Sequence, residues 1–209
     1  MCAKLWNKGK QRGISLVELI LFMVIISVAV AGVLLVMNKV TGQSSDALIR
    51  KQALAIAESV LEEVEAMPFT FCDPDDPNAA TAVNAAGCTP GLSQDVISGP
   101  TPGVESRYSM TSPLDNVADY ANCRLNRAGG STGCDAGIVA PLPAINDITG
   151  TPNTALGDYA ATVTLARAGL VLGLPTDPDA LQITVAVTGP GGAQLRLDGY
   201  RIRYAPNSF

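Results

Sequence analysis

One carboxylate, Glu18, lies near the start of an otherwise apolar run that extends from Ile14 to Met37. A run of this length can span a bilayer. A carboxylate within such a span costs roughly 2.5–3.5 kcal/mol at the centre and less near the interface. Such a group usually has a partner of opposite charge, and the same helix offers none close by. We therefore expect the partner of Glu18 on another molecule.

Four cysteines follow the apolar run, and their chemistry points to disulfides. Cys2 stands before the run, and an even number of cysteines comes after it, namely Cys72, Cys88, Cys123 and Cys134. An even number in an exported, loop-rich region favours disulfides, although four cysteines allow three connectivities. We favour the two local pairs, Cys72 with Cys88 and Cys123 with Cys134. A loop of about 15 residues gains roughly 3 kcal/mol from such a closure.

The remaining chemistry-bearing residues are sparse. Asp73, Asp75 and Asp76 offer oxygen ligands for calcium, but solvated Asp-Pro turns are the preferred interpretation, so no metal or other cofactor is predicted. Histidine is absent, which removes His-based triads, His general bases and the commonest zinc ligand. The chain also has no Cys-x-x-Cys pair. We predict that the protein is not an enzyme.

Charge distribution gives the expected orientation. The first thirteen residues hold four of the fourteen basic residues and no acidic ones: Lys4, Lys8, Lys10 and Arg12. Basic residues stay on the cytoplasmic side of a membrane span, so the chain after the span is exported. Loss of these four positive charges would take the net charge from −5 to −9. An acidic exported domain argues against nucleic acid as a partner.

The first expected element is one long helix over residues 14–67, with the membrane span at 14–37. In its second half Leu54, Ala57, Leu61 and Val64 recur at helical spacing and predict an apolar stripe. Glutamates 62, 63 and 65 are expected on solvated or subunit-contacting faces. Pro68 ends the helix, because proline disfavours helix in the residue before it.

Residues 68–153 form the second region, a loop-rich insertion that carries all four retained cysteines. Turn signals such as Gly99-Pro100 and Pro141-Leu142-Pro143 recur through it. A short helix is expected over 114–126, capped by Asp115 or Ser112.

The third region, residues 154–209, reads as antiparallel strands. Segments 158–165, 181–188 and 194–204 alternate apolar and polar residues, and Gly189-Pro190-Gly191-Gly192 makes the turn of a C-terminal hairpin. The alternation changes phase between Leu197 and Tyr200, which predicts a bulge near Gly199. The predicted fold class is α+β: a long N-terminal helix, transmembrane in its first half, packed on a C-terminal antiparallel sheet.

The N-terminal residues carry a family resemblance. A basic leader, Gly13, an apolar residue and then Ser15-Leu16-Val17-Glu18 resemble the class III signal of type IV prepilins and pseudopilins. The resemblance implies cleavage after Gly13 by a prepilin peptidase, so that residues 1–13 are a cleaved leader. It also implies N-methylation of Ile14, where the family usually has Phe, and a role for Glu18 in assembly, by pairing with the freed amine of a neighbouring subunit. A plain signal anchor would fit the length of the run but gives no reason for Glu18.

The helix segment 52–64 and the C-terminal hairpin narrow the resemblance. They are similar to MshD-type minor pilins of mannose-sensitive haemagglutinin (MSHA) pilus systems. This implies a pilin-like fold and a minor pilin that assembles into a filament or primes it. The implied partners are other pilin subunits, bound through the N-terminal helix, and an inner-membrane assembly platform. The implied location is the inner membrane of a Gram-negative bacterium, single-pass with a cytoplasmic N-terminus and a periplasmic C-terminal domain, and then the pilus at the cell surface. The alternatives are a minor pseudopilin of a type II secretion system, or a pilus-borne adhesin or DNA-binding module.

Overall fold

The structure is a computed structural model. It describes residues 13–95, 97, 99–100, 105–125, 134, 145–147 and 149–207, with the side chains of 41–45 outside that description. The chain divides into two compact units, Met1–Ser45 and Asp46–Phe209. Helix α1 (Leu16–Ala66) begins in the first unit and ends in the second.

The segment Leu16–Val40 of α1 is apolar on every face apart from the charges of Glu18 and Lys39. Leu16–Val40 is long and apolar enough to cross a membrane, and none of it is buried within the chain. The helix starts two residues later than predicted, because the carbonyl of Ser15 accepts its first hydrogen bond, from the Leu19 amide at 3.1 Å. A helix that is apolar all round needs lipid or other helices to cover it.

The part of α1 in the second unit is amphipathic. Its buried stripe has helical spacing and consists of Ala53, Ile56, Ala57, Val60, Leu61 and Val64. Leu54, predicted to belong to the stripe, is 37% exposed, and its neighbour Ala53 is buried instead. The helix ends at Ala66, two residues before Pro68.

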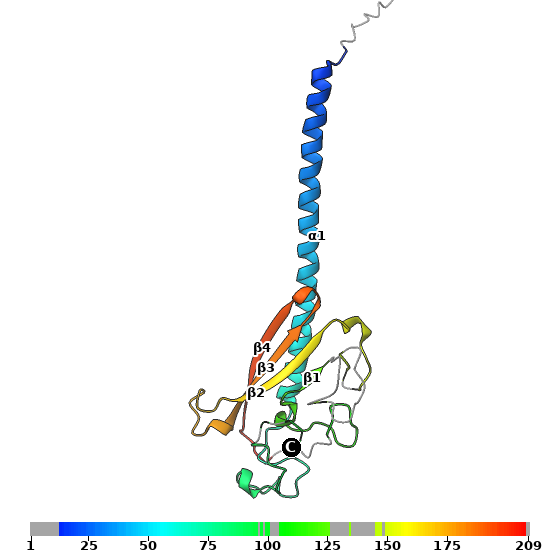
Figure 1. The fold of residues 1–209 in the computed structure, drawn as a ribbon. Coiled ribbons are helices and arrows are strands. Elements are labelled where there is room, and N and C mark those ends of the chain that lie inside the picture. Colours follow the sequence, from blue (N-terminus) through cyan, green and yellow to red (C-terminus); the bar gives the residue numbers. More distant parts are fainter. Residues whose placement is uncertain are drawn as a thin grey trace, which may run out of the picture. The chain divides into compact units, whose positions relative to one another are not determined.

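One four-stranded sheet covers this stripe (Figure 1). Its strands are β1 (Arg124–Leu125), β2 (Ala160–Arg167), β3 (Ala180–Thr188) and β4 (Gln194–Ile202). They pair in the order β1-β2-β3-β4, and every pair is antiparallel. The predicted α+β class, a long helix packed on an antiparallel sheet, is confirmed.

The predicted bulge near Gly199 is wrong. The pairing of β3 with β4 runs without a break from Ala180 opposite Ile202 to Thr188 opposite Gln194. Gly199 occupies an inward position of β4, and a Cβ there would overlap Glu65 Oε1 and lie 2.9 Å from Leu61 Cδ1. Side chains of the helix thus fill the space that a Cβ of residue 199 would occupy. The apparent change of phase in the alternation of apolar and polar residues arises only because this inward residue has no side chain.

The predicted short helix over 114–126 is also wrong. The segment forms a single 3-10 turn, η2 (Val117–Tyr120), capped by Asn116 rather than by Asp115 or Ser112. Asn116 accepts from the turn while the Asp119 side chain accepts from the Asn116 amide, a capping box. The described loops also contain the 3-10 turns η1 (Ala85–Gly87), η3 (Thr154–Leu156), η4 (Asp177–Asp179) and η5 (Pro190–Gly192).

Glu63 is not on a solvated face, contrary to the interpretation from sequence. Arg107 donates to Glu63 through Nε at 2.6 Å and Nη2 at 2.5 Å, and Tyr120 donates through its hydroxyl at 3.0 Å. Both side chains are largely buried, at 7% exposure for Arg107 and 15% for Glu63. Burial alone would lower the pKa of Arg107, but the hydrogen bonds and charge of Glu63 raise it. This ion pair ties α1 to the loop that follows residue 105.

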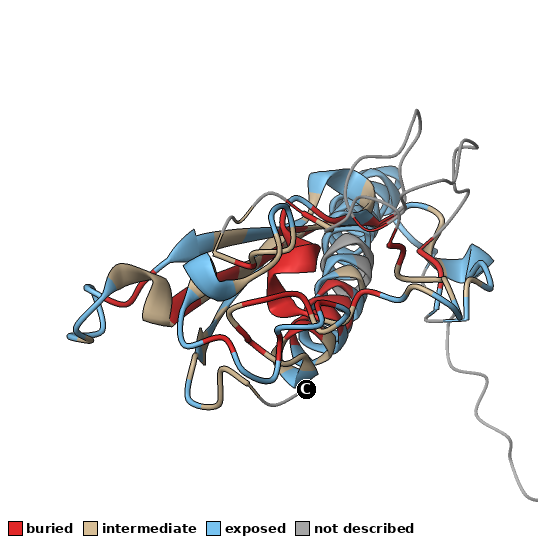
Figure 2. Cartoon of the chain, turned by 90° about the horizontal axis from the view of Figure 1, so that it is seen from below, coloured by how far each residue is buried: buried red, intermediate tan, exposed pale blue. Residues whose placement is uncertain are grey.

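The core of the second unit lies between the stripe of α1, the inner face of the sheet and η2. Figure 2 shows the buried residues gathered at the centre of the cartoon, between the helix, the strands and the loops. Cys72, Ala79 and Ala82 form a smaller apolar cluster within the loop after α1.

Candidate functional site

Gly13 and Ile14 lie just before the first turn of α1. Both are exposed, with Ile14 at 74%, and neither has helical structure. A Cβ on Gly13 would meet no atom within 4 Å, so packing within the described chain does not demand a glycine there. Among the described residues, therefore, nothing covers the expected scissile bond between Gly13 and Ile14. Residues 1–12 of the expected leader lie outside the described residues.

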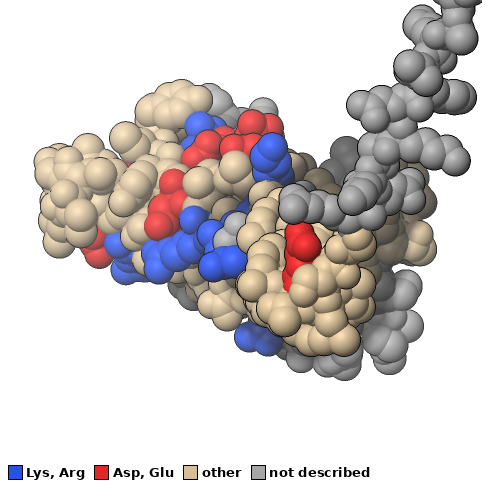
Figure 3. Space-filling model, turned by 90° about the horizontal axis from the view of Figure 1, so that it is seen from above, with Lys and Arg blue, Asp and Glu red and all other residues tan. Residues whose placement is uncertain are grey.

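Glu18 lies in the first turn of α1. It is exposed, and none of the ion pairs formed among the described residues includes it. A negative charge in a first helical turn gains roughly 0.3–1 kcal/mol from the helix dipole, which does not replace a positively charged partner in an apolar medium. Figure 3 shows a red acidic patch within the tan surface of this apolar segment, and Glu18 is the only acidic residue between positions 13 and 45.

The spacing places Glu18 four residues after Ile14, about one helical turn. A free amine at Ile14 would therefore stand at the same end of the helix as the carboxylate. The N-terminal end of each copy would then carry one positive group, the amine of Ile14, and one negative group, Glu18, on an otherwise apolar segment. That arrangement suits reciprocal pairing between neighbouring copies of such helices.

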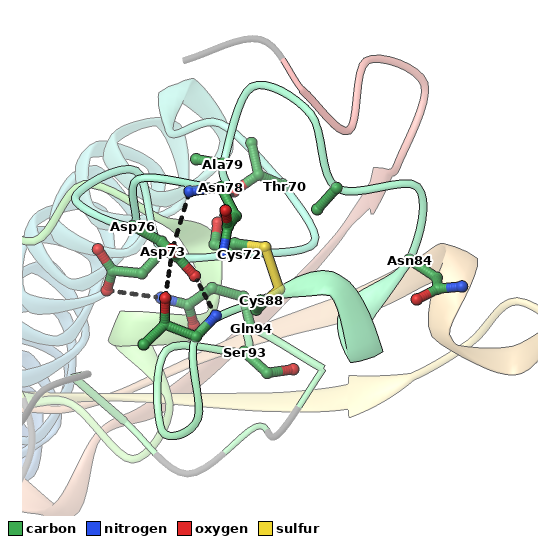
Figure 4. The surroundings of a disulfide bond; sticks show 12 residues. Thr70, Cys72, Asp73, Asp76, Asn78, Ala79, Asn84, Cys88, Ser93 and Gln94 are labelled. Atoms are coloured by element: carbon green, nitrogen blue, oxygen red, sulfur yellow. Dashed lines mark hydrogen bonds between the residues drawn. A yellow bond between two sulfur atoms is a disulfide. The ribbon is translucent and has the colours of Figure 1, made fainter.

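The structure joins Cys72 to Cys88 and Cys123 to Cys134 (Figure 4 shows the surroundings of Cys72–Cys88). These are the two local pairs favoured from the sequence. Cys72 also lies near Asp76, but its sulfur and that of Cys88 are bonded to each other and offer no thiolate to a metal.

The three aspartates considered for calcium separate into two environments. Asp76 serves the loop itself: it accepts hydrogen bonds from the Thr89 amide at 2.7 Å, the Thr89 hydroxyl at 2.8 Å and the Asn78 amide at 2.9 Å. Desolvation raises the pKa of Asp76, but these hydrogen bonds outweigh it and hold the pKa below its ordinary value. Asp73 and Asp75 belong to another group.

That group, called here the carboxylate cluster, consists of Asp73, Asp75, Glu105 and Asp115. One carboxylate oxygen from each lies within 4.8 Å of those of the other three. The cluster draws on three loop segments, and sequence reasoning missed Glu105 and Asp115. No spacing rule connects them to Asp73, because a loop-rich region has no periodicity to show which residues meet.

Burial and mutual repulsion shift the pKa values of the cluster upward. Burial, followed by the charges of Asp119 and the other cluster members, raises the pKa of Glu105 to about 9. Burial and then Asp73 raise the pKa of Asp115 to about 7. Burial also raises the pKa of Asp73. The three loops therefore hold carboxylates in a place where negative charge is disfavoured unless something positive joins them.

Comparison with known families concerns the N-terminal end alone. Residues 8–34 match the prokaryotic N-terminal methylation motif. This motif is the N-terminal signal of type IV pilin-like and pseudopilin proteins, and it favours a structural role. Such a signal implies processing by a prepilin peptidase and assembly with other pilins, and it fits a membrane-anchored protein together with the apolar helix. No curated protein and no solved structure matches the chain.

Proposed function

We propose that this chain is a minor type IV pilin of the MSHA type, which assembles into a pilus filament or primes one. One observation carries the proposal: Glu18 is the only acidic residue of an exposed apolar helix segment and lies one turn from the expected new N-terminus. The methylation motif supports the processing step. The second unit, with its sheet and two disulfides, suits an exported domain.

The sequence of events follows from the charges. The basic leader holds the N-terminus in the cytoplasm while Leu16–Val40 rests in the inner membrane and the second unit enters the periplasm. Cleavage after Gly13 removes residues 1–13 and frees the amine of Ile14, which is then methylated. A secondary amine keeps its positive charge, so methylation leaves the electrostatic partner for Glu18 intact.

Assembly exchanges lipid for neighbouring helices around the apolar segment. This exchange does not determine how neighbouring helices align, because lipid tails are as apolar as the helices. The charges supply the register. An uncompensated charge buried between helices costs about 3–5 kcal/mol, and a positive Ile14 amine on a neighbour removes that penalty. The helices would therefore lock where Glu18 of one subunit meets Ile14 of the next.

Replacement of Glu18 tests this mechanism. Glu18→Val removes the only carboxylate of the span, so the chain should insert and be cleaved but should not enter filaments. An antibody to the second unit measures the amount of the chain in sheared pili and the amount that stays in membranes. Glu58→Val is the matched control, because Glu58 is an exposed residue of the same helix outside the apolar segment, and it should assemble normally. Wild-type amounts of the Glu18→Val chain in sheared pili would refute the proposal.

A minor pseudopilin of a secretion system would share the signal and the helix. The sheared-pilus fraction separates the two, because a pseudopilus stays within the envelope. Intact mass of the chain from membranes checks the processing step independently: we expect loss of residues 1–13 and one added methyl group.

A further inference from the structure

We propose that the carboxylate cluster, Asp73, Asp75, Glu105 and Asp115, is a calcium site of the second unit. The observation behind it is a juxtaposition of four carboxylates, two of them buried, without a basic partner. None of the ion pairs among the described residues involves any of the four.

Glu105 is the residue that a solvated acidic turn does not explain. Its side chain is buried, with the residue 1% exposed, and no amide, hydroxyl or basic group among the described residues donates to its carboxylate. The one hydrogen bond that its carboxylate shares is with another acid of the cluster, Asp73. Asp115 Oδ1 is likewise buried without a partner. Buried polar groups in native proteins are nearly always satisfied, and an orphaned one calls for an explanation such as an ion. Eight buried side-chain atoms among the described residues lack such a partner, and three of them, Oε1 and Oε2 of Glu105 and Oδ1 of Asp115, belong to the group of oxygens that converge.

The spacing of the oxygens matches calcium. Calcium binds six to eight oxygens at 2.3–2.6 Å, so two ligands on opposite sides of the ion lie at most about 4.6–5.2 Å apart. One oxygen from each cluster residue lies within 4.8 Å of the others. Four ligand oxygens thus fit around a single ion, with bidentate carboxylates or water completing the shell. Oxygen donors alone favour calcium over metals that prefer sulfur or nitrogen.

The surrounding loops hold the ligands in place. The Asp73 amide donates to the Leu92 carbonyl at 2.8 Å, and the Gln94 side-chain amide donates to Asp73 Oδ2 at 3.2 Å (Figure 4 shows Asp73 and Gln94). The same Gln94 nitrogen donates to Asp119 at 3.1 Å. The Asp119 carboxylate in turn accepts from the Asp115 amide at 3.2 Å.

Two further constraints fix the segments that carry Asp73 and Asp115. Asp73 follows Cys72 of the first disulfide. Asn116, next to Asp115, donates from its side chain to Thr70 at 2.6 Å. Side-chain hydrogen bonds therefore tie the segments of Asp73 and Asp115 to each other, and the disulfide holds the first of these segments, before any ion arrives. Such preorganisation lowers the ordering cost of binding.

The expected affinity is that of an extracellular module, with a dissociation constant of about 10⁻⁴–10⁻³ M. A site of this affinity is suited to the calcium concentrations found outside the cell. Magnesium is the poorer fit, because it demands near-ideal octahedral geometry at 2.0–2.1 Å and gives up its water reluctantly. Calcium would neutralise the repulsion within the cluster and stabilise the loop region that bears both disulfides.

The test uses the full chain, purified from membranes in a mild detergent and stripped with a chelator. Addition of calcium to about 100 times its dissociation constant should raise Tm by roughly 5–10 °C. Titration calorimetry with calcium alone gives the affinity. Glu105→Gln should weaken binding at least tenfold and remove most of the Tm shift, and Asp115→Asn should act in the same direction. The control is Glu62→Gln, which makes the same substitution at an exposed position of α1. It should keep the wild-type calcium affinity and the wild-type Tm shift.

Three results would overturn the site. They are a wild-type chain whose Tm ignores calcium, a Glu105→Gln chain that keeps the full calcium response, and an equal response to magnesium at the same concentration. Glu105→Gln keeps the side-chain volume and is neutral, as is the protonated carboxyl of the chelated chain, so it should fold in the chelated state and leave the comparison readable. The proposal does not rest on the proposed pilin function, because the site contains no residue of the first unit.

Discussion

At the scale of single residues, Glu63 shows how a charge can be misread from sequence. Glu62, Glu63 and Glu65 look like one solvated run, yet Glu63 is the residue that Arg107 binds through two nitrogens. Its partner lies 44 residues away in a loop-rich region. Helical periodicity tells which face a residue occupies, but not which distant loop covers that face.

The ion pair gives a stability prediction. Glu63→Ala leaves the Arg107 guanidinium buried without its carboxylate, so the free energy of unfolding should fall by about 3–5 kcal/mol. Glu62→Ala, the adjacent exposed residue, should change it by no more than about 0.5 kcal/mol. Thermal unfolding of both variants in detergent, followed by near-ultraviolet circular dichroism, measures the difference. Equal effects of the two substitutions would contradict the buried pair.

The carboxylate cluster gives a pH prediction for the chelated protein. Glu105 has a pKa of about 9 in the folded chain and an ordinary value of 4.5. Between these values the folded state holds a proton that the unfolded state lacks, so the contribution of Glu105 to stability is present at low pH and is lost as the pH rises toward 9. The charged groups facing it are Asp73, Asp75, Asp115 and Asp119.

The measurement is Tm against pH from 5 to about 9, in chelator, for wild type and Glu105→Gln. Wild-type Tm should fall relative to that of the variant as the pH rises, because the amide does not titrate. Parallel curves would show that Glu105 ionises in the folded chain as it does in water. Calcium should reduce the difference between the two ends of the wild-type curve, since it favours the ionised carboxylates.

At the scale of elements, the regular parts of the fold are visible in the sequence and the loops are not. Strands β2, β3 and β4 alternate apolar and polar residues because one face of the sheet is buried, and the pattern located each within about two residues. The helix was bounded by Pro68 and by its apolar start. In contrast, η2 depends on a capping box, whose Asn116 and Asp119 are three residues apart, and on contacts to the segment after α1, which leave no local pattern in the sequence.

The wrong prediction of a bulge near Gly199 has a physical cause. A glycine at an inward strand position removes one apolar residue from the alternation, and the outward Tyr200 and Ile202 are then read as a second apolar face. They are in fact 47% and 46% exposed. The same absence of a side chain lets α1 approach the sheet at Leu61 and Glu65.

This close approach predicts the effect of filling it. Gly199→Val places branched carbons where Leu61 and Glu65 now lie, and overpacking of this kind destabilises by about 1–3 kcal/mol. Tyr200→Val, on the exposed face of the same strand, should change stability by less than about 1 kcal/mol because it touches the core little. Denaturant midpoints of the two variants decide the matter. A Gly199→Val chain as stable as wild type would mean that the helix and sheet have room to separate.

At the scale of the whole molecule, the sequence predicted the class of protein better than it predicted any site outside the N-terminus. The basic leader, Glu18 and the apolar run 14–37 are local features of the sequence, so they can be recognised without a structure. The cluster of Asp73, Asp75, Glu105 and Asp115 is a property of three folded loops and emerges only when the chain is closed. The second unit also keeps its disulfides only if it is exported, which links topology to covalent structure.

That link gives a prediction about orientation. Lys4, Lys8, Lys10 and Arg12 precede the span, while Lys39, Arg50 and Lys51 lie at or soon after its end. In the proposed topology, the excess of basic residues that would keep the N-terminus in the cytoplasm is therefore small. Replacement of the four leader cations by glutamine leaves all nearby basic residues on the other side of the span, and the second unit should then stay in the cytoplasm in a large share of molecules.

Thiol labelling of the whole chain reads out the result. Cytoplasmic copies should expose four reactive cysteines after residue 13, because thiols there are kept reduced, whereas exported copies should react at these positions only after reduction. Replacement of Lys39 by glutamine instead strengthens the original bias, so that chain should stay fully oxidised. If the chain without leader cations is exported and oxidised like wild type, the orientation is set by the second unit or by the peptidase signal itself and not by the balance of charge across the span.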